Sequence, residues 1–547
     1  MKIITKKIYI ITLAVFLLTS CSDFLNEANP NYPNETNSWS TESEALNALA
    51  TVYSPIRGQM YGFWGAYTGF RNQNVRGDDV YHPAGEDAYE FAAFTNSPSS
   101  GQVSDDWAYA YKGIARANTF LENIDRVPFV NDGEDARKNA MKGEAYFLRA
   151  WNYFMLVINW GDVPLRLKQA SLEDRVIASS PEADVWKQII SDLKEAEKLL
   201  PDKRDQTEYG RVTKGAAIAY LGKSYVYNKQ WQDAFDELNK LEDRSIISTK
   251  YELVEDPDYN YDEKHEFNSE SLFEFNYANL GGTGTWSTDD ASTAQWNVLA
   301  VIMGTQGGWE HMQATKFIVD EFTKEPRPSG SDSKWDKRMY STFFFKYSDY
   351  NDVKPDAVWY GNKPFDDLWA EKKDGEIKRK VKADTIISDN LGKCRFLIKK
   401  WTAYWSSKES PDWDGSRNEN NVRVMRYADA VLLRAEAAAQ LGTKDAEANA
   451  DLKLIRDRAG LEEKTFSGKD EIMKEIEHQR LLEFWMEGQR FHDMKRWYTT
   501  EQMVEKFAKN RRNSIGANTF KEKFRYFPIP SSEINTNTLV QQHPLWK

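Results

Sequence analysis

Residues 426–460 read RYADAVLLRAEAAAQLGTKDAEANADLKLIRDRAG, and their spacing sets the architecture that we expect for the chain. Small and aliphatic side chains recur at helical spacing, first at Ala428, Val431, Leu432, Ala435 and Ala439, then at Ala448, Leu452, Ile455 and Ala459. This period predicts two amphipathic helices, and Gly460 closes the second. Because small residues let antiparallel helices come close together, the pattern predicts a tetratricopeptide-like helix pair.

A second pair of this kind is predicted upstream, at residues 212–241, where the small residues Ala219 and Gly222 face larger ones on the following helix. Helical periodicity also predicts helices at residues 107–125, 139–159, 182–200, 470–486 and 489–507. We therefore expect a mainly α-helical protein. Its tetratricopeptide-like scaffold of about four helix pairs would comprise residues 41–60, 105–245 and 425–510.

Residues 250–420 have a different character, because helical periodicity largely disappears and Gly, Asn, Asp, Ser and Trp become frequent. Nine of the 19 tryptophans lie there, at positions 286, 296, 309, 335, 359, 369, 401, 405 and 413. This composition predicts an irregular, loop-rich lobe inserted between helix pairs, which would use some of these rings as core. Residues 61–98 are predicted to be an exposed loop, and residues 515–547 an extended segment.

The N-terminus carries a basic leader and an apolar run, Ile8 to Leu18, that is too short to remain as a membrane anchor. Leu18-Thr19-Ser20-Cys21 follows, and this pattern is similar to bacterial lipoprotein signals. It predicts a signal peptide at residues 1–20, cleavage before Cys21, acylation of Cys21, and a lipid-anchored tether at residues 21–40. The alternative is an ordinary secretory signal followed by a chance cysteine.

Composition excludes some classes of protein. A formal net charge of −12 argues against a phosphate-binding surface, so we expect no nucleic-acid partner. The chain has two cysteines, Cys21 and Cys394, and acylation of the first would leave the second without a partner. A disulfide framework is therefore not expected.

Four stretches together resemble the SusD/RagB family of Bacteroidetes outer-membrane lipoproteins. They are Cys21-Ser-Asp-Phe-Leu, residues 143–165 from GEAYFLRA to GDVPL, residues 426–460, and residues 483–497 together with Tyr526-Phe-Pro-Ile-Pro. The resemblance implies a glycan-capturing protein that is anchored on the cell surface by lipid. It also implies a partner, a SusC-like TonB-dependent transporter of the outer membrane.

A sugar ring has an apolar face and a polar rim, so its site needs exposed flat aromatics with polar side chains around them. Trp309 and Trp286 both follow glycines, and their positions resemble those of the family's stacking residues. Trp296 and Tyr81 are further candidate platform residues. Asp78, Arg71 and Asn72, from the first aromatic-rich loop, are candidate hydrogen-bonding partners. The alternative is that these rings form core and that the polar groups bind backbone or water.

No catalytic or metal-binding pattern emerges from the sequence. Asp256, Asp258, Asn260 and Asp262 alternate like the start of a calcium loop, but an EF-hand would need Gly at position 261 and Glu at position 267. A different structural calcium site stays open, and otherwise we expect no cofactor. We expect a binding protein rather than an enzyme. The alternatives are a surface glycoside hydrolase, with its pair of carboxylates, and a peptide-binding helical-repeat adaptor.

Overall fold

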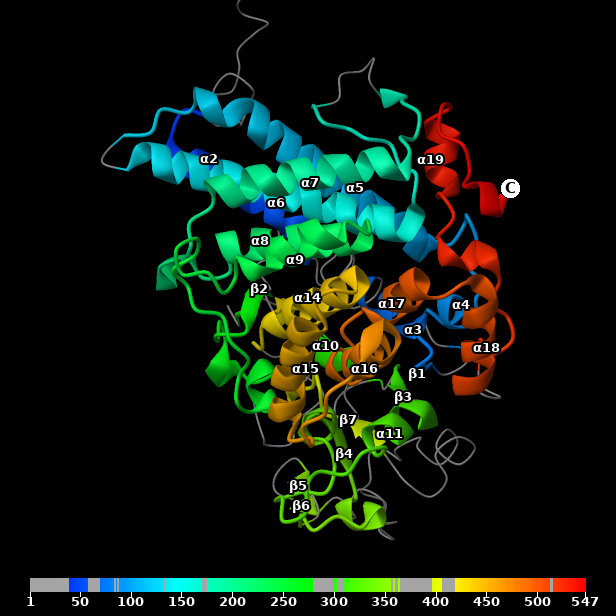
Figure 1. Ribbon diagram of the computed structural model, residues 1–547. Coiled ribbons are helices and arrows are strands. Elements are labelled where there is room, and N and C mark those ends of the chain that lie inside the picture. Colours follow the sequence, from blue (N-terminus) through cyan, green and yellow to red (C-terminus); the bar gives the residue numbers. More distant parts are fainter. Residues whose placement is uncertain are drawn as a thin grey trace, which may run out of the picture.

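The computed structural model of this protein is mainly helical (Figure 1). It describes residues 39–57, 69–82, 85, 88–130, 133–169, 175–278, 297, 299–303, 309, 311–355, 358–359, 363–364, 396–405, 419–511 and 515–547. The predicted signal peptide, Cys21 and nearly all of the tether lie outside the described residues. Within the described part, none of the helices combines the length and the apolar character needed to cross a bilayer.

The scaffold is a stack in which successive helices pack against one another. Its first part contains α2 (Glu42–Tyr53), α5 (Gly101–Asn123), α6 (Glu134–Trp160), α7 (Glu182–Leu199), α8 (Lys214–Tyr227) and α9 (Trp231–Asn239). Its second part contains α14 (Tyr427–Leu441), α15 (Asp445–Ala459) and α16 (Gly468–Glu483). Because α14 packs on α8 and α9, the two parts join in space although the lobe separates them in sequence (Figure 1).

Small residues set the closest helix contacts, as the sequence predicted. A Cβ placed on Gly222 of α8 would lie 2.4 Å from Cγ of Leu238 on α9, so this crossing requires glycine. Ala428 and Ala435 of α14 are fully buried, as are Ala448 and Leu452 of α15. The mainly helical fold is thus confirmed, whereas the number of pairs and their tetratricopeptide-like geometry stay predictions.

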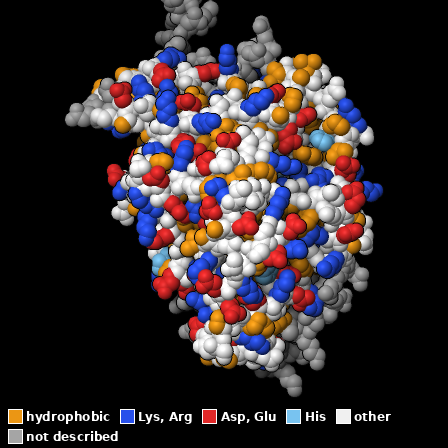
Figure 2. Space-filling view, viewed as in Figure 1, with side chains coloured by type: hydrophobic (Ala, Val, Ile, Leu, Met, Phe, Trp, Pro, Cys, Tyr) orange, Lys and Arg blue, Asp and Glu red, His pale blue; other side chains and the backbone are white. Residues whose placement is uncertain are grey.

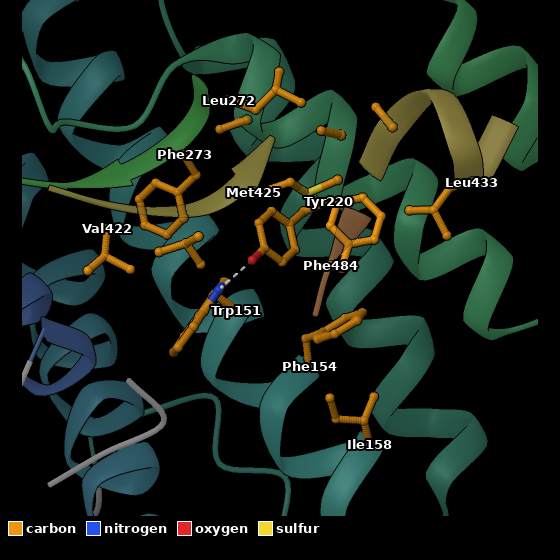
Figure 3. Packing of buried hydrophobic residues seen from close by; sticks show 14 of the residues in the cluster. Trp151, Phe154, Ile158, Tyr220, Leu272, Phe273, Val422, Met425, Leu433 and Phe484 are labelled. Carbon is orange, nitrogen blue, oxygen red and sulfur yellow. Dashed lines mark hydrogen bonds between the residues drawn. The ribbon is translucent and has the colours of Figure 1, made fainter. Parts of the chain in front are cut away.

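The core continues from the scaffold into the lobe (Figure 3). Trp151 of α6 donates its indole N–H to the Tyr220 hydroxyl of α8 over 3.0 Å. Phe273 packs edge-on against Phe147, with ring centroids 5.1 Å apart. Phe273 belongs to β2 (Ser271–Phe275), which pairs antiparallel with β8 (Val422–Arg426). The two ends of the lobe are thereby joined to each other and to the helices beneath them.

The lobe is irregular, and its described part carries short elements. They are α10 (Leu299–Met303), β3 (Gln313–Ala314), α11 (Lys316–Phe322), α12 (Lys337–Thr342), β4 (Phe343–Phe345), β5 (Val358–Trp359), β6 (Lys363–Pro364) and β7 (Phe396–Ile398). β4 pairs with β7 and β5 with β6, both antiparallel. Trp401 and Trp405 are buried, so some of the lobe's tryptophans are core, as we expected.

The described part of the chain also contains short 3-10 helices. They are η2 (Ser54–Arg57), η3 (Ile124–Arg126), η5 (Gln206–Glu208), η6 (Pro257–Asn260), η7 (Glu263–His265), η8 (Tyr347–Tyr350), η11 (Ala403–Trp405), η13 (Glu522–Arg525) and η14 (Pro544–Trp546). On the face shown in Figure 2, Lys and Arg side chains are interspersed with Asp and Glu.

Three predictions about local structure were wrong. The single helix expected at 489–507 is two helices, α17 (Arg490–Trp497) and α18 (Thr500–Asn510), because Thr499 forms a capping box with Gln502 and starts a new helix. The C-terminal segment is not simply extended, since it contains α19 (Ser531–Thr536) as well as η13 and η14. The expected exposed loop at 61–98 contains a fully buried helix, α3 (Gly69–Val75), besides β1 (Val80–Tyr81) and α4 (Tyr89–Ala92).

Buried charges join the lobe to the scaffold. We call this set the junction network; its members are Glu270, Asp336, Arg338, Lys400, Arg426, Arg458, Glu483 and Glu487. All eight side chains are buried, and four cations balance four carboxylates. Ions withdrawn from water are costly unless they are paired, so the fold requires every member to keep its partners.

Glu483, at the C-terminal end of α16, is shared by three arginines. Its carboxylate lies 2.7 Å from Nη1 of Arg426, 2.5 Å from Nη2 of Arg458 and 3.1 Å from Nη1 of Arg338. Burial opposes the charged form of Glu483, but the three guanidinium groups outweigh it and hold its pKa well below the usual range. Glu483 is therefore ionised at neutral pH and neutralises lobe and scaffold arginines together.

We expect Glu483→Gln to lower the free energy of unfolding by about 3 to 5 kcal/mol, because it leaves buried arginines without their shared counter-charge. Chemical denaturation of the variant and the wild type measures the difference. Lys187→Ala is the control, since Lys187 makes an exposed ion pair with Asp184 and its loss should change stability by less than about 1 kcal/mol. Equal, small effects of both substitutions would contradict this role of Glu483.

Candidate functional site

The candidate site lies where the first aromatic-rich segment meets the lobe. β1 pairs antiparallel with β3, and the register places Tyr81 opposite Gln313 and Val80 opposite Ala314. This short ladder places Tyr81, predicted as a site residue, beside β3, the strand that follows Trp309. Two parts of the chain separated by more than 200 residues thus lie side by side (Figure 1).

Trp309 is half-buried and packs against the hydrophobic core. Its ring lies 5.0 Å from that of His311, with an angle of 33° between the planes. Nδ1 of His311 lies 2.8 Å from Nη1 of Arg71, and the His311 backbone N–H donates to the Ile302 carbonyl. The tryptophan is thus supported from one side by a fixed imidazole and keeps part of its surface exposed.

His82 completes the support behind Trp309. Its Nδ1 makes a short hydrogen bond with the backbone carbonyl of His311, and the two imidazole rings meet edge to face with centroids 6.4 Å apart. Both histidines are buried. Both lie close in sequence to predicted site residues, since His82 is next to Tyr81 and His311 is two residues after Trp309. Sequence reasoning gave neither of them a role in the site.

The base of the ladder is fixed by hydrogen bonds to one carbonyl group. The Asp79 carbonyl accepts from the Thr315 hydroxyl over 3.2 Å and from the Trp485 indole over 3.1 Å. Thr315 follows β3, and Trp485 lies just after α16. The site is therefore connected to the scaffold directly beside the junction network.

Three polar residues predicted to contact ligand are enclosed in the protein instead. Arg71 and Asn72 belong to the buried α3, where Asn72 donates to the Asp106 carboxylate over 3.1 Å. Asp78 accepts from Arg490 over 2.6 Å and from Asn510 over 2.6 Å. Because all three side chains are withdrawn from the surface, direct contact with a glycan is at odds with the structure, and their role is to hold the segment in place.

The remaining candidates divide into two groups. Trp286, Trp296 and Cys21 lie outside the described residues, so their roles stay predictions. The suspected calcium residues have other partners: Asp256 and Asp262 cap η6 and η7, and Asn260 donates to Glu270 over 3.0 Å. The described part of the chain contains no cluster of three or more His, Cys, Asp or Glu residues that could hold a metal ion.

The adjacent carboxyl groups Asp78 and Asp79 have opposite electrostatic environments. Burial opposes the charge on Asp78, but Arg490 and the hydrogen bonds from Arg490 and Asn510 lower its pKa. For Asp79, burial and the charge of Asp78 raise the pKa to about 7. Oδ1 of Asp79 also finds no hydrogen-bond partner within the described part of the chain. Asp78 therefore stabilises the fold as an anion, whereas the fold favours the protonated form of Asp79.

Comparison with known protein families identifies the family of the chain. A family model described as "SusD family" matches residues 269–546, which is more than half of the chain. The chain belongs to the SusD family. A second model, described as "Starch-binding associating with outer membrane", matches residues 23–226. The two matches cover most of the SusD-like body, and the family resemblance noted in the sequence is confirmed.

Individual members of the SusD family are similar along most of their length. SusD-like protein P2 of Formosa agariphila is 26% identical over 509 residues, which cover 90% of each chain. The starch-binding protein SusD of Bacteroides thetaiotaomicron is 24% identical over 491 residues, covering 84% of this chain and 82% of that protein. A crystal structure of a SusD superfamily protein from Bacteroides vulgatus has a TM-score of 0.76 and 29% identity, and covers 93% of this chain and 100% of that one.

Because the pKa values of Asp78 and Asp79 are shifted in opposite directions, we expect substitution by Asn to have opposite effects on stability at the two positions. Because the pKa of Asp79 is raised from 3.8 to about 7, its native form keeps a proton that the unfolded form loses, and stability falls as pH rises from about 4 to 7. We expect Asp79→Asn to be more stable than the wild type at pH 8, with a smaller difference at pH 5. Chemical denaturation at both pH values measures this.

Asp78→Asn is the matched variant, because its pKa is lowered and its charge stabilises the fold above the pKa of the unfolded form. We expect it to be less stable than the wild type at pH 8, since it weakens the contact with Arg490. A loss of stability in Asp79→Asn at pH 8 as large as that in Asp78→Asn would contradict these assignments.

Proposed function

We propose that this protein captures an oligosaccharide or polysaccharide at the cell surface by stacking a sugar ring on Trp309, without cleaving it. The observation that carries the proposal is the β1–β3 ladder, which pairs the strand of Tyr81 with the strand that follows the half-buried Trp309. Trp286 and Trp296, which lie outside the described residues, are proposed as further residues of the platform. The named starch-binding relative supports carbohydrate as the ligand class.

The proposal includes a location and a partner. The signal pattern ending at Cys21 supports acylation and anchoring in the outer membrane, in agreement with the family description that mentions this membrane. Membership of the SusD family supports delivery of the captured glycan to a SusC-like TonB-dependent transporter. Capture by stacking suits delivery, because an intact ligand held by weak contacts can be released to the transporter.

One observation favours the alternative of a glycoside hydrolase. Asp78 and Asp79 are neighbouring carboxyl groups with pKa values shifted in opposite directions, as in acid–base catalysis. However, Asp78 is 0% and Asp79 1% exposed, so both carboxyl groups are enclosed in the protein. A glycosidic bond cannot reach them in this structure, which supports binding over hydrolysis.

Trp309→Ala should weaken glycan binding by about 5- to 150-fold, because stacking on one aromatic ring contributes about 1 to 3 kcal/mol. Affinity electrophoresis against plant, fungal and host polysaccharides identifies a ligand, and calorimetry with an oligosaccharide of that glycan measures the loss. Trp231→Ala, which removes a half-buried tryptophan from α9 of the scaffold, is the control. Unchanged binding by a folded Trp309→Ala protein would place the site elsewhere.

Incubation of the wild type with the polysaccharide that it binds should release no new reducing ends. The expected result follows from the burial of Asp78 and Asp79. Turnover that disappears in the Asp79→Asn variant would contradict the binding-only function and support the hydrolase alternative.

A further inference from the structure

A second aromatic pair joins a residue of the scaffold to a residue of the lobe. Tyr209 follows η5 in the connection between α7 and α8, and Phe267 lies between η7 and β2. Their ring centroids are 4.9 Å apart, and the planes meet at 42°. Tyr209, at 45% exposure, and Tyr89, at 37%, are the most exposed aromatic side chains in the described part of the chain. Of these two, Tyr209 is the one with a described contact to a second aromatic ring, that of Phe267.

Phe267 is held in an uncommon backbone conformation. Its φ of +52° lies in the left-handed region, which a bulky side chain rarely adopts. The Phe267 backbone N–H donates to the Glu274 carboxylate over 3.2 Å. Such a conformation persists where the surrounding structure fixes it, and here it directs a phenyl ring toward Tyr209.

A buried ion pair holds the backbone around Phe267 in this conformation. Glu274 lies 3.3 Å from Nε of Arg423, and both side chains are almost completely buried. Nη2 of Arg423 donates to the backbone carbonyls of His265, over 3.0 Å, and Asp262, over 3.3 Å. The loop that carries Phe267 is thus attached from inside at three points. A rigid support of this kind lowers the entropy that a ligand would lose on binding the ring.

An exposed asparagine, Asn276, lies next to the backbone that follows Tyr209. Gly210 has a φ of +92°, and a Cβ placed on it would be 3.1 Å from Cβ of Asn276. The absence of a side chain on Gly210 therefore lets Asn276 approach the backbone next to Tyr209. Asn276 is itself exposed. Flat aromatic rings with an adjacent amide match the apolar face and the hydroxyl rim of a pyranose.

We propose that Tyr209, Phe267 and Asn276 form a second carbohydrate platform, which binds a pyranose unit of the same polysaccharide. A sugar ring would stack on Tyr209 with its edge toward Phe267, and its hydroxyl groups would hydrogen-bond with the Asn276 amide. This inference rests on the proposed function. This platform shares no residue with the Trp309 site, and a long chain that reaches both would gain from their linkage.

The test compares a long polysaccharide with a short oligosaccharide of the same glycan. Tyr209→Ala should weaken retardation in a gel containing the polysaccharide by about fivefold or more, the effect of one stacking contact. Calorimetry with an oligosaccharide just long enough to bind the Trp309 site should give the wild-type affinity. Tyr209→Phe, which keeps the ring, and Tyr89→Ala, which removes the other exposed tyrosine, should behave like the wild type.

The possible failures are distinguishable. If Tyr209→Ala is retarded like the wild type while Trp309→Ala is not, the second platform is wrong and the proposed function stands. If Tyr209→Ala and Tyr89→Ala weaken retardation equally, the effect is not specific to this pair, and the platform is again wrong. If no polysaccharide in the panel retards the wild type, the proposed function fails and this inference fails with it.

Discussion

The charge of Glu483 is the constraint on which the rest of the structure depends. Three arginines from separate elements converge on this buried carboxylate, and two of them also bind Glu270 at the start of the lobe. Each of these ions would be unfavourable alone, so the lobe and the scaffold are stable only when they bring their charges together. An irregular lobe with few regular hydrogen-bonded elements thereby gains a defined position on a helical frame.

Hydrogen bonds also connect the junction network to the proposed binding site. Lys400 of the junction network donates to the backbone carbonyls of Glu483, over 3.3 Å, and Trp485, over 2.8 Å. Trp485 in turn donates its indole N–H to Asp79, next to β1. The ladder that aligns Tyr81 with the Trp309 segment is therefore fixed to the network that joins the lobe to the scaffold. A stacking site needs this rigidity, because a ring that moves freely loses entropy when it binds.

Much of the fold could be predicted from the sequence, because helical periodicity is a local signal. The pairs formed by α8 and α9 and by α14 and α15 follow directly from the spacing of small residues. The break before α18 was also locally encoded, since Thr499 and Gln502 form the capping-box pattern.

The buried α3 was not locally encoded, because its polar side chains find partners at positions far along the chain, such as His311 for Arg71. Polar residues next to aromatics therefore suggested an exposed loop where the structure has a buried helix. For the same reason, the sequence named Trp309 as a candidate but gave no role to His82 and His311, which meet only in the folded protein.

Native-state hydrogen exchange tests most directly whether the lobe and the scaffold form one cooperative unit. The amides of β2, β7 and β3 in the lobe should exchange with the same free energy of opening as those of α14 and α16, which is that of global unfolding. Exchange of the lobe amides at a clearly lower free energy than the scaffold amides would contradict the account, because the junction network would then not couple the two parts.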